Sequence, residues 1–503
     1  MAALVMMNRK KKSILYLLCS GALIYYVIQV VYFNQEYSPL QVLADARSEA
    51  RRLLRFITLY HYQCNNTVMM SNNTNWPICT EVDGGINLES KNSKKAYSVG
   101  PSEDLEFERL LVRNLSFNVF LMCHRPIYND GSLNNTYVIK TVVVPNNPSD
   151  FTRNSYETQT LNDIMLNLHH THIDILKIEN VMDEINTHEI LFYLVNDDLL
   201  KKVDQLHISL HIDKVDDDHL YSWYRSLYNL FHKSRFRLYH TSASDQLCLQ
   251  VTLMESCTYY MSWVRDPGPQ TMILYPPAID GSMEFELSRI EDYLEKPEGY
   301  CDDSVDIPVL RGTPISLCTN TDRYMLRNPC KIILIGEEKM QLTTDSYLPF
   351  DLRCDVIGLK MLDGHIDADV NEYTTNNKGT LQQSTHGRST VLEALDKYTL
   401  YDNKNILYLN MPDMFWEIIT PLLNSGVLKG FHQLIIDINL HRISKNLPVG
   451  TIRTYFSELK RIESYGFDLF QSIKLGNGVK FGKNSEHHRL NYVKTRPPFG
   501  KST

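Results

Sequence analysis

The stretch KKAYSVGPSEDLEFERLL, from Lys94 to Leu111, predicts a buried strand, a glycine turn and the start of a helix. Many nucleotide-cofactor sites begin in this way, because a glycine lets a ligand approach the backbone closely. The stretch therefore predicts an α/β unit with a candidate cofactor turn at Gly100.

The same pattern recurs later in the chain. The segment CKIILIGEEKMQLTTDSYLPFDLRCDVIGL, which begins at Cys330, again has a strand, a glycine (Gly336), an acidic turn and a second apolar strand. Further along, IDILKI at 173–178 corresponds to KNILYL at 404–409. Agreement over several elements in the same order predicts a tandem duplication.

Short β-rich runs alternate with amphipathic helices within each copy. DILKI, LHISLHI and FRLYH are strand-like, and this alternation predicts an α/β unit with a largely parallel sheet. We expect one domain at 61–265, a linker and helix at 266–299, a second domain at 300–495 and a tail at 496–503.

The N-terminal residues predict a membrane anchor. Residues 1–12 end in a basic cluster, and residues 13–33 form an apolar run without charge. Such a run suffices to cross a bilayer core of about 30 Å, and its basic flank should stay cytoplasmic. We expect a single-pass type II protein with a stem helix at 34–60, facing the lumen of the Golgi or ER or the cell exterior. A cleaved signal peptide is the alternative, but no small-residue cleavage site follows the run.

Sequons and cysteines agree with a secretory location. Four asparagines lie in glycosylation sequons: Asn65, Asn72, Asn114 and Asn134. Nine of the ten cysteines lie beyond the anchor, and because nine is odd, at least one thiol is free or pairs between chains. Cys64 and Cys79 recur as Cys301 and Cys318, so we expect a structural disulfide in each copy.

The net charge of −8 argues against nucleic acid as a partner, because phosphate binding needs a concentrated basic surface. The partners predicted from the sequence are the membrane and an unidentified lumenal substrate or protein.

Several motifs together resemble a known family. RRLLRFITLYHYQC, WPIC, YSVGPSEDLEFE, DILKI, QLHISLHI and WYRSLYNLFHKSRFRLYH occur in the order and spacing of the membrane-anchored methyltransferase-like proteins of animals. The resemblance covers most of the first copy and, more faintly, the second. It implies two doubly wound domains of the S-adenosylmethionine-dependent methyltransferase fold, with the cofactor at the carboxyl ends of the strands.

The resemblance also implies a cofactor site in the first copy. Tyr97, Gly100, Asp104 and Glu108 match the family's first strand, turn and following helix, and S-adenosylmethionine is the implied cofactor. The family has an acid at the end of the second strand, where it takes the ribose hydroxyls. Cys123 stands there in this chain, and a neutral thiol cannot accept two hydrogen bonds as a carboxylate does.

Two further residues match the family's catalytic edge. Glu179 stands where an aspartate is expected after the fourth strand, and His211 keeps the histidine of the next strand. Ordinary structural roles fit as well. Gly100 suits a turn with positive φ, Glu108 suits a first helical turn, and His211 suits a hydrogen-bonded histidine.

The second copy departs from the family pattern at other places. It keeps Gly336, but Lys360 stands at the acid of the second strand and Asn410 at the acid of the fourth. Neither copy is complete, so the duplication is partly degenerate.

Two other motifs suggest metal binding. His169, His170 and His172 are close together, but they lack a partnered carboxylate motif, so the sequence predicts no metal site. KVDDDH, with Asp216 to Asp218, resembles the Asp-X-Asp motif of lumenal glycosyltransferases, but it lies between the repeated elements, where a solvated acidic loop is the better interpretation.

Three functions therefore compete. The first is S-adenosylmethionine-dependent methyl transfer in the secretory lumen by the first copy, which the degenerate motifs would have weakened or abolished. The second is a non-catalytic pseudo-methyltransferase that acts as a binding or scaffold module. The third is a lumenal glycosyltransferase.

Overall fold

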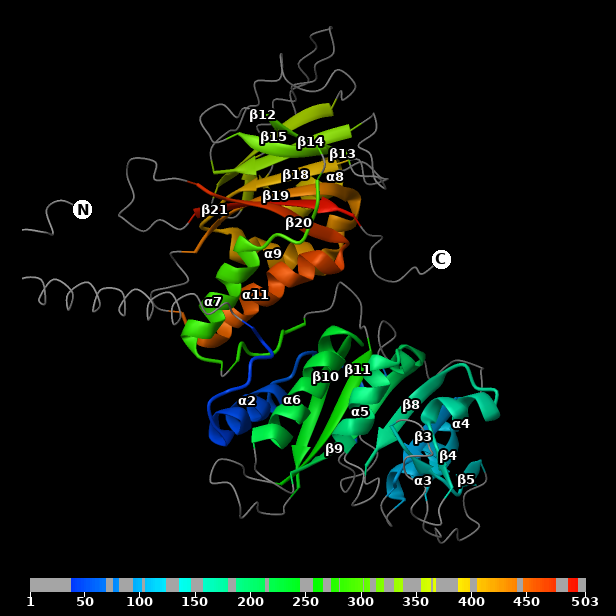
Figure 1. Cartoon of the computed structure of the whole chain (residues 1–503). Helices are drawn as coiled ribbons and strands as arrows, with labels where there is room; N and C mark the ends of the chain where they lie inside the picture. The colour runs from blue at the N-terminus through cyan, green and yellow to red at the C-terminus, as the bar shows by residue number, and fades with distance from the viewer. Residues whose placement is uncertain are drawn as a thin grey trace, which may run out of the picture. The chain divides into compact units, whose positions relative to one another are not determined.

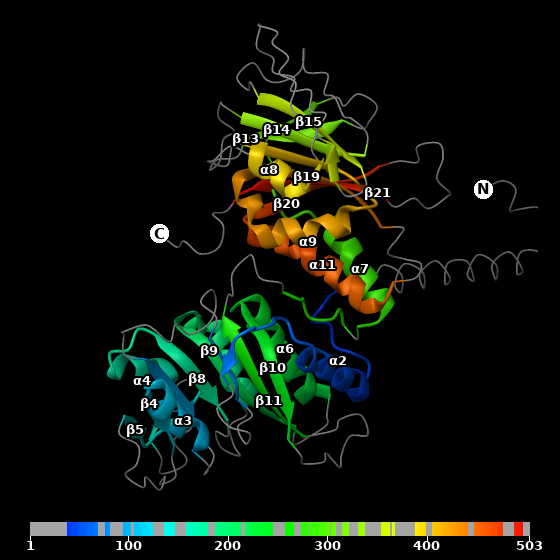
Figure 2. The ribbon, with the colours of Figure 1, turned by 180° about the vertical axis from the view of Figure 1, so that it is seen from behind.

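The structure is a computed structural model of the chain (Figures 1 and 2). It describes residues 38–68, 76–80, 94–101, 105–123, 135–145, 157–179, 187–212, 217–244, 257–265, 273–279, 281–301, 303–307, 314–320, 330–337, 354–362, 365–367, 388–398, 405–440, 447–475 and 487–495.

Residues 46–265, here called domain 1, form a seven-stranded sheet in the order β10-β11-β9-β8-β3-β4-β5. The strands are β3 (Lys95–Val99), β4 (Asn118–Met122), β5 (Thr136–Ile139), β8 (Ile173–Ile178), β9 (Val203–His211), β10 (Phe236–Ala243) and β11 (Thr258–Arg265). Neighbours from β5 to β9 run parallel, whereas β11 lies antiparallel between β9 and β10. Counted along the chain, the order is 3-2-1-4-5-7-6, which makes the sheet doubly wound about its first strand.

The helices of domain 1 connect these strands. They are α2 (Ala46–Thr58), α3 (Glu106–Leu115), α4 (Leu161–Asn167), α5 (Thr187–Asn196), the short 3-10 helix η3 (Leu199–Lys202) and α6 (Asp217–His232). Strand β3 is buried almost throughout, as expected for a parallel strand covered on both faces. Two short pairs complete the domain: β1 (Thr67–Val68) with β2 (Ile78–Cys79), and β6 (Val142–Val143) with β7 (Thr158–Gln159).

The segment expected to be a stem is part of domain 1. Its helix α2 begins after Asp45, whose side chain accepts a hydrogen bond from the Ser48 backbone N–H (2.9 Å), a usual N-cap. Leu53 and Phe56 on its apolar face are fully buried, and the helix packs on α6 (Figure 1). An amphipathic helix is stabilised by such packing, so α2 belongs to the domain core.

Residues 283–494, here called domain 2, form an eight-stranded sheet in the order β17-β16-β15-β14-β18-β19-β21-β20. Its elements are α7 (Met283–Glu295), β12 (Asp303–Ile307), β13 (Ile315–Asn320), β14 (Cys330–Gly336), β15 (Cys354–Leu362), β16 (His365–Asp367), β17 (Arg388–Ser389), α8 (Val391–Tyr398), β18 (Asn405–Asn410), α9 (Phe415–Ser425), η4 (Val427–Gly430), β19 (Phe431–Asn439), α11 (Val449–Ser464), β20 (Phe467–Lys474) and β21 (His487–Lys494). The order from β15 to β20 repeats that from β4 to β10. The third strand differs, because β16 runs antiparallel to β15.

The two domains repeat individual contacts as well as strand order. Gln205 donates to the Cys79 carbonyl and accepts from the Cys79 N–H (3.1 Å). Gln433 makes the same two contacts with Cys318 (3.0 Å from the N–H). In each case a glutamine, on β9 or on its counterpart β19, holds the backbone of a disulfide-bonded cysteine.

Disulfides join Cys64 to Cys79 and Cys301 to Cys318. Each closes a short loop beside its own domain, 15 residues long in the first case and 17 in the second. Among the described residues, Cys123 is a free and buried thiol.

The predicted membrane anchor requires a correction. Among the residues that the structure describes, no helix is long and apolar enough to cross a membrane. The longest described helices, α6 and α11, have 16 residues each and span about 24 Å, less than the roughly 30 Å of a bilayer core. Residues 13–33, where we placed the anchor, lie outside the described residues. This finding corrects the predicted single-pass type II topology and secretory location.

Candidate functional site

The strand order places the candidate site at the carboxyl ends of β3 and β8. In a doubly wound sheet, ligands bind outside the carboxyl ends of the strands, where the order of the strands reverses. In domain 1 this point lies between β3 and β8, which are adjacent and parallel. Gly100 follows β3 and Glu179 follows β8, so the two predicted residues end neighbouring strands.

Gly100 makes the turn that the sequence predicts. Its φ of 60° lies in the left-handed region, which glycine adopts without steric cost. Its N–H donates to the Met122 carbonyl (3.0 Å), which ties the turn to the end of β4. Asp104 lies outside the described residues.

A buried ionic network lies beside this turn. Lys177 Nζ lies 3.0 Å from Glu108 Oε1 and 2.7 Å from Glu179 Oε2. Ser98 donates to the same Glu108 oxygen at 2.6 Å. Ser98 and Lys177 are register partners on β3 and β8, and Glu108 reaches them from α3. The consecutive elements β3 and α3 are thus joined to the distant strand β8 at one buried point.

The network keeps Lys177 charged in the interior. Burial alone would lower the pKa of its ammonium, but Glu108 and Glu179 outweigh burial, so the pKa is raised. The ammonium also lies 5.6 Å from the ring centre of Trp76 and 5.4 Å from that of Phe107, which favours a cation. One ammonium therefore pairs with both carboxylates at this edge.

The predicted catalytic carboxylate is also fixed through its backbone. The Glu179 N–H donates to the Val99 carbonyl (3.1 Å), and its carbonyl accepts from the Ser209 hydroxyl (2.5 Å). Ser209 lies on β9, so Glu179 joins the ends of three adjacent strands. Its carboxylate is mostly buried, with 14% of the side chain exposed.

His207 is a neighbour of the network that the sequence did not single out. It is the register partner of Lys177, and its Nδ1 lies 2.9 Å from Ser262 Oγ. Burial, with the positive charge of Lys177 second, lowers the pKa of His207 to about 3, so the ring is neutral. Its Nε2 has no hydrogen-bond partner among the described residues.

The other two predicted residues lie apart from the network. Tyr97 is fully buried, and its hydroxyl contacts His170 Nδ1 at 2.6 Å. His211 is exposed at the end of β9, with Nδ1 2.7 Å from the Thr258 hydroxyl. The structure thus brings Gly100, Glu108 and Glu179 together.

Cys123 decides whether this edge fits S-adenosylmethionine. It follows β4, beside Gly100, where the resemblance requires an acid. The thiol is 7% exposed, and burial raises its pKa, so it stays neutral. A neutral thiol is a weak acceptor, and the nearby carboxylates of Glu108 and Glu179 are held by Lys177. The described residues therefore do not fit the ribose of this cofactor.

The carboxyl edge of the domain 2 sheet has different side chains at the corresponding positions. Lys360 and Asn410 are both register partners of Gly336, where the family pattern has acids. Asp437 on β19 is buried and paired with Arg489 (2.7 Å), and it also accepts from the Tyr408 hydroxyl (2.8 Å). The Asp437 carboxylate is thus already bound by side chains of domain 2 itself.

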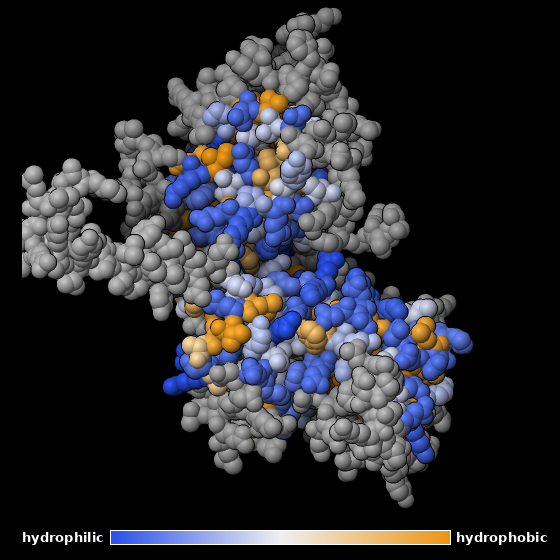
Figure 3. Space-filling model, in the orientation of Figure 1, coloured by the Kyte–Doolittle hydropathy of each residue, from blue (hydrophilic) through white to orange (hydrophobic). Residues whose placement is uncertain are grey.

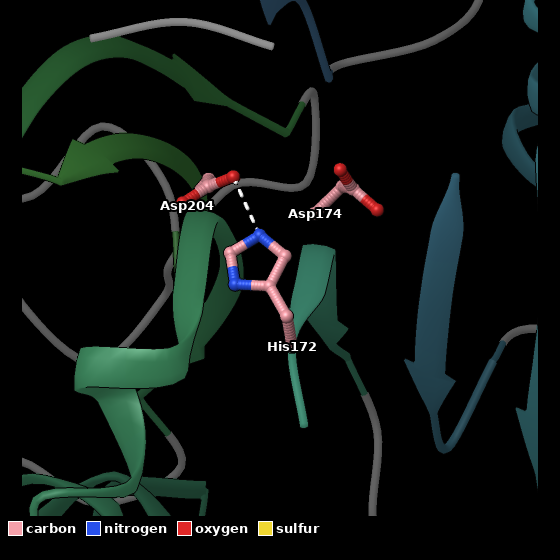
Figure 4. A group of neighbouring side chains, drawn as sticks. All are labelled: His172, Asp174 and Asp204. Carbon is pink, nitrogen blue, oxygen red and sulfur yellow. Dashed lines mark hydrogen bonds and ion pairs between the residues drawn. The ribbon is translucent and has the colours of Figure 1, made fainter. Parts of the chain in front are cut away.

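The structure also assembles a cluster at the opposite edge of the domain 1 sheet. His172 directly precedes β8, Asp174 lies on β8, and Asp204 lies at the start of β9 (Figure 4). His172 Nε2 lies 2.8 Å from Asp204 Oδ2, and the ligand atoms of all three lie within 4.8 Å of one another. The sequence pattern points to the histidine but not to Asp204, because 32 residues separate the two and only the pairing of β8 with β9 brings them together.

The remaining predicted positions lie on the surface or outside the described residues. Asn65 and Asn114 are exposed, and Asn72 and Asn134 lie outside. Asp218 is exposed in the first turn of α6, and Asp216 lies outside. Glycosylation stays a prediction. The described surface in Figure 3 is mainly hydrophilic, with apolar side chains in small groups.

The known proteins to which the chain is similar are solved structures. No family model and no curated protein matches the chain. Among solved structures, the chain is similar to the methyltransferase domain of METTL16, at 10% identity and a TM-score of 0.24, over 35% of this chain and 62% of that one. It is also similar to the human methyltransferase 10 domain containing protein, at 13% identity and a TM-score of 0.23, over 43% of this chain and 97% of that one.

A third similar structure is a phosphoethanolamine N-methyltransferase 2 of Haemonchus contortus, in complex with phosphomonomethylethanolamine and S-adenosylhomocysteine. It shares 10% identity and a TM-score of 0.20, over 81% of this chain and 96% of that one. The chain spans less than two thirds of the METTL16 domain. At these scores the similarities carry no argument about function. The strand order by itself establishes a doubly wound α/β sheet in domain 1.

Proposed function

We propose that the chain is a methyltransferase-like protein that has lost S-adenosylmethionine-dependent methyl transfer in both domains and acts as a binding or scaffold module. The two domains arose by duplication of one ancestral domain. The repeated strand order and the matching contacts of Gln205 and Gln433 support this origin.

One observation carries the proposal: the thiol of Cys123 at the end of β4 is free, buried and neutral, and the resemblance implies a ribose-binding acid at this position. Two hydroxyls of a ribose need acceptors, and charge-assisted hydrogen bonds to a carboxylate are about twice as strong as neutral ones. A site without that acceptor leaves the hydroxyls unpaired when water is excluded, which costs about 1–3 kcal/mol for each group.

Domain 2 supports the same conclusion. An ammonium at Lys360 only donates hydrogen bonds, so it cannot replace the acid either. The two domains lack the acid through different residues, which is the pattern expected when each loses the activity separately.

A thermal-shift measurement tests the proposal. A ligand present at 100 times its Kd stabilises a protein by about 2.7 kcal/mol, which shifts the Tm of a domain of this size by about 5–10 °C. We expect S-adenosylmethionine and S-adenosylhomocysteine at about 1 mM to shift the Tm of the full chain by less than about 1 °C. A shift of about 5 °C or more would show that methyl transfer remains possible.

No observation favours the glycosyltransferase. Asp218 is exposed in the first turn of a helix, where a carboxylate is stabilised by the helix dipole without any ligand.

A further inference from the structure

The structure assigns a divalent transition-metal site, most suited to Zn²⁺, to His172, Asp174 and Asp204 at the amino edge of the domain 1 sheet. This site is independent of the proposed function, because it lies at the opposite ends of the strands from Gly100 and Glu179. We call these three residues the amino-edge cluster.

The backbone fixes the cluster. The register of β8 with β9 places Asp204 beside Asp174, because the next residues along the two strands, Gln205 and Ile175, are register partners. Asp174 and Asp204 therefore lie on neighbouring strands, and His172 reaches them from the residue before β8. Figure 4 shows the imidazole between the two carboxylates. Ligands that project from paired strands are held in position, which metal affinity requires.

Each carboxylate is oriented by a second contact. Asp204 Oδ1 accepts from Arg265 (2.9 Å), while its Oδ2 faces His172. Asp174 Oδ2 accepts from the Lys95 N–H (2.7 Å). Outer contacts of this kind fix the ligands of metal sites. They leave Asp174 Oδ1 for the ion, and Asp204 Oδ2 becomes a ligand when zinc replaces the hydrogen that it shares with His172 Nε2.

The distances suit a small ion. Two ligands bound to zinc at about 2.0–2.2 Å lie about 3.0–3.5 Å apart. The closest pair, His172 Nε2 and Asp204 Oδ2, is at 2.8 Å, and all three ligand atoms lie within 4.8 Å of one another. Shifts of side chains without movement of the strands would therefore admit the ion.

The charge and the solvent exposure of the amino-edge cluster also suit a bound cation. Two carboxylates face one guanidinium, Arg265, so one negative charge is uncompensated when the imidazole is neutral. The side chains of His172 and Asp204 are 43% and 29% exposed, which lets an ion reach them from solvent. Imidazole with carboxylates suits zinc better than calcium or magnesium, which prefer all-oxygen sites.

Domain 2 provides a natural contrast. Asn405 and His432 stand at the positions of Asp174 and Asp204, as the registers of β14 with β18 and the contacts of Gln433 show. The Asn405 amide donates to the Gly430 carbonyl (2.7 Å), and His432 is buried. Asn405 and His432 offer no pair of carboxylates, so among the described residues the site belongs to domain 1.

Calorimetric titration of the full chain with ZnCl₂ at pH 7.5, after removal of metals with a chelator, tests the site. We expect one zinc ion per chain, with a Kd in the micromolar range or below. Asp174→Asn and Asp204→Asn should each weaken binding at least about 10-fold. Both amides keep an oxygen for Lys95 or Arg265, and the Tm of each variant in chelator checks that it folds.

The matched controls are His169→Asn and Asp198→Asn, an exposed histidine and an exposed carboxylate outside the cluster. Both should bind zinc as the wild type does. The assignment is overturned if no saturable binding occurs up to about 0.1 mM zinc. It is also overturned if binding survives both cluster variants, or if calcium or magnesium binds more tightly than zinc.

Discussion

Lys177 Nζ lies 3.0 Å from Glu108 Oε1 although 69 residues separate the two in the chain, and both side chains are almost fully buried. This pair joins α3 to β8, and it holds Glu179 at the end of the strand. Its main consequence is for the stability of domain 1.

Glu108→Gln should destabilise domain 1 by about 1.5–3 kcal/mol, because it removes one charge-assisted contact of the buried Lys177 ammonium while Glu179 still pairs with it. Urea unfolding followed by tryptophan fluorescence measures the change, since Trp76 lies beside Lys177. Glu106→Gln, on the more exposed side of the same helix, should cost less than about 0.5 kcal/mol. A loss below 1 kcal/mol for Glu108→Gln would contradict this role.

The repeated glutamines predict matched effects in the two domains. Gln205→Leu and Gln433→Leu each remove two hydrogen bonds to the backbone of a buried cysteine, at a cost of about 2–4 kcal/mol. Hydrogen exchange should localise each loss to its own domain. Gln159→Leu, which removes only an exposed contact with Glu157, serves as the control and should have little effect.

His207 predicts acid sensitivity. Its pKa is about 3 in the folded protein against an ordinary value near 6.5, so the unfolded chain binds more protons between these two pH values. Stability is present in full above pH 6.5 and falls as the pH drops, by about 3 kcal/mol at pH 4 from this residue alone. His207→Gln should lose correspondingly less stability than the wild type between pH 7 and pH 4. Equal losses in urea titrations would exclude this contribution.

Cys123→Asp tests the missing acid by gain of function. A carboxylate at this position restores the acceptor that a ribose needs, so S-adenosylhomocysteine should bind at least about 10-fold more tightly than to the wild type. Cys123→Ser adds a neutral hydroxyl of similar size and should not gain binding. If both variants behave alike, the position of Cys123 does not limit cofactor binding.

Local patterns in the sequence predict the fold of each domain well. The apolar run before Gly100 becomes β3, and the glycine adopts a positive φ. The cysteine pairs Cys64–Cys79 and Cys301–Cys318 form disulfides. These features depend on short-range alternation, turn chemistry and spacing, which a single sequence records.

The sequence does not reveal contacts that depend on the pairing of strands far apart in the chain. The partners of Lys177 and the approach of Asp204 to His172 depend on strand register, which no local pattern specifies. The segment 34–60 was expected to be a separate stem, but the burial of Leu53 and Phe56 makes α2 part of the core. Amphipathicity shows that a helix has a partner, but it does not show which one.

Isothermal titration of the full chain with S-adenosylhomocysteine tests the central claim most directly. The account predicts no saturable heat up to about 1 mM ligand, because Cys123 offers no ribose acceptor and Lys177 holds the neighbouring carboxylates. Saturable 1:1 binding with a Kd below about 0.1 mM, abolished by Gly100→Val and retained by Gly336→Val, would contradict it and assign a working cofactor site to domain 1.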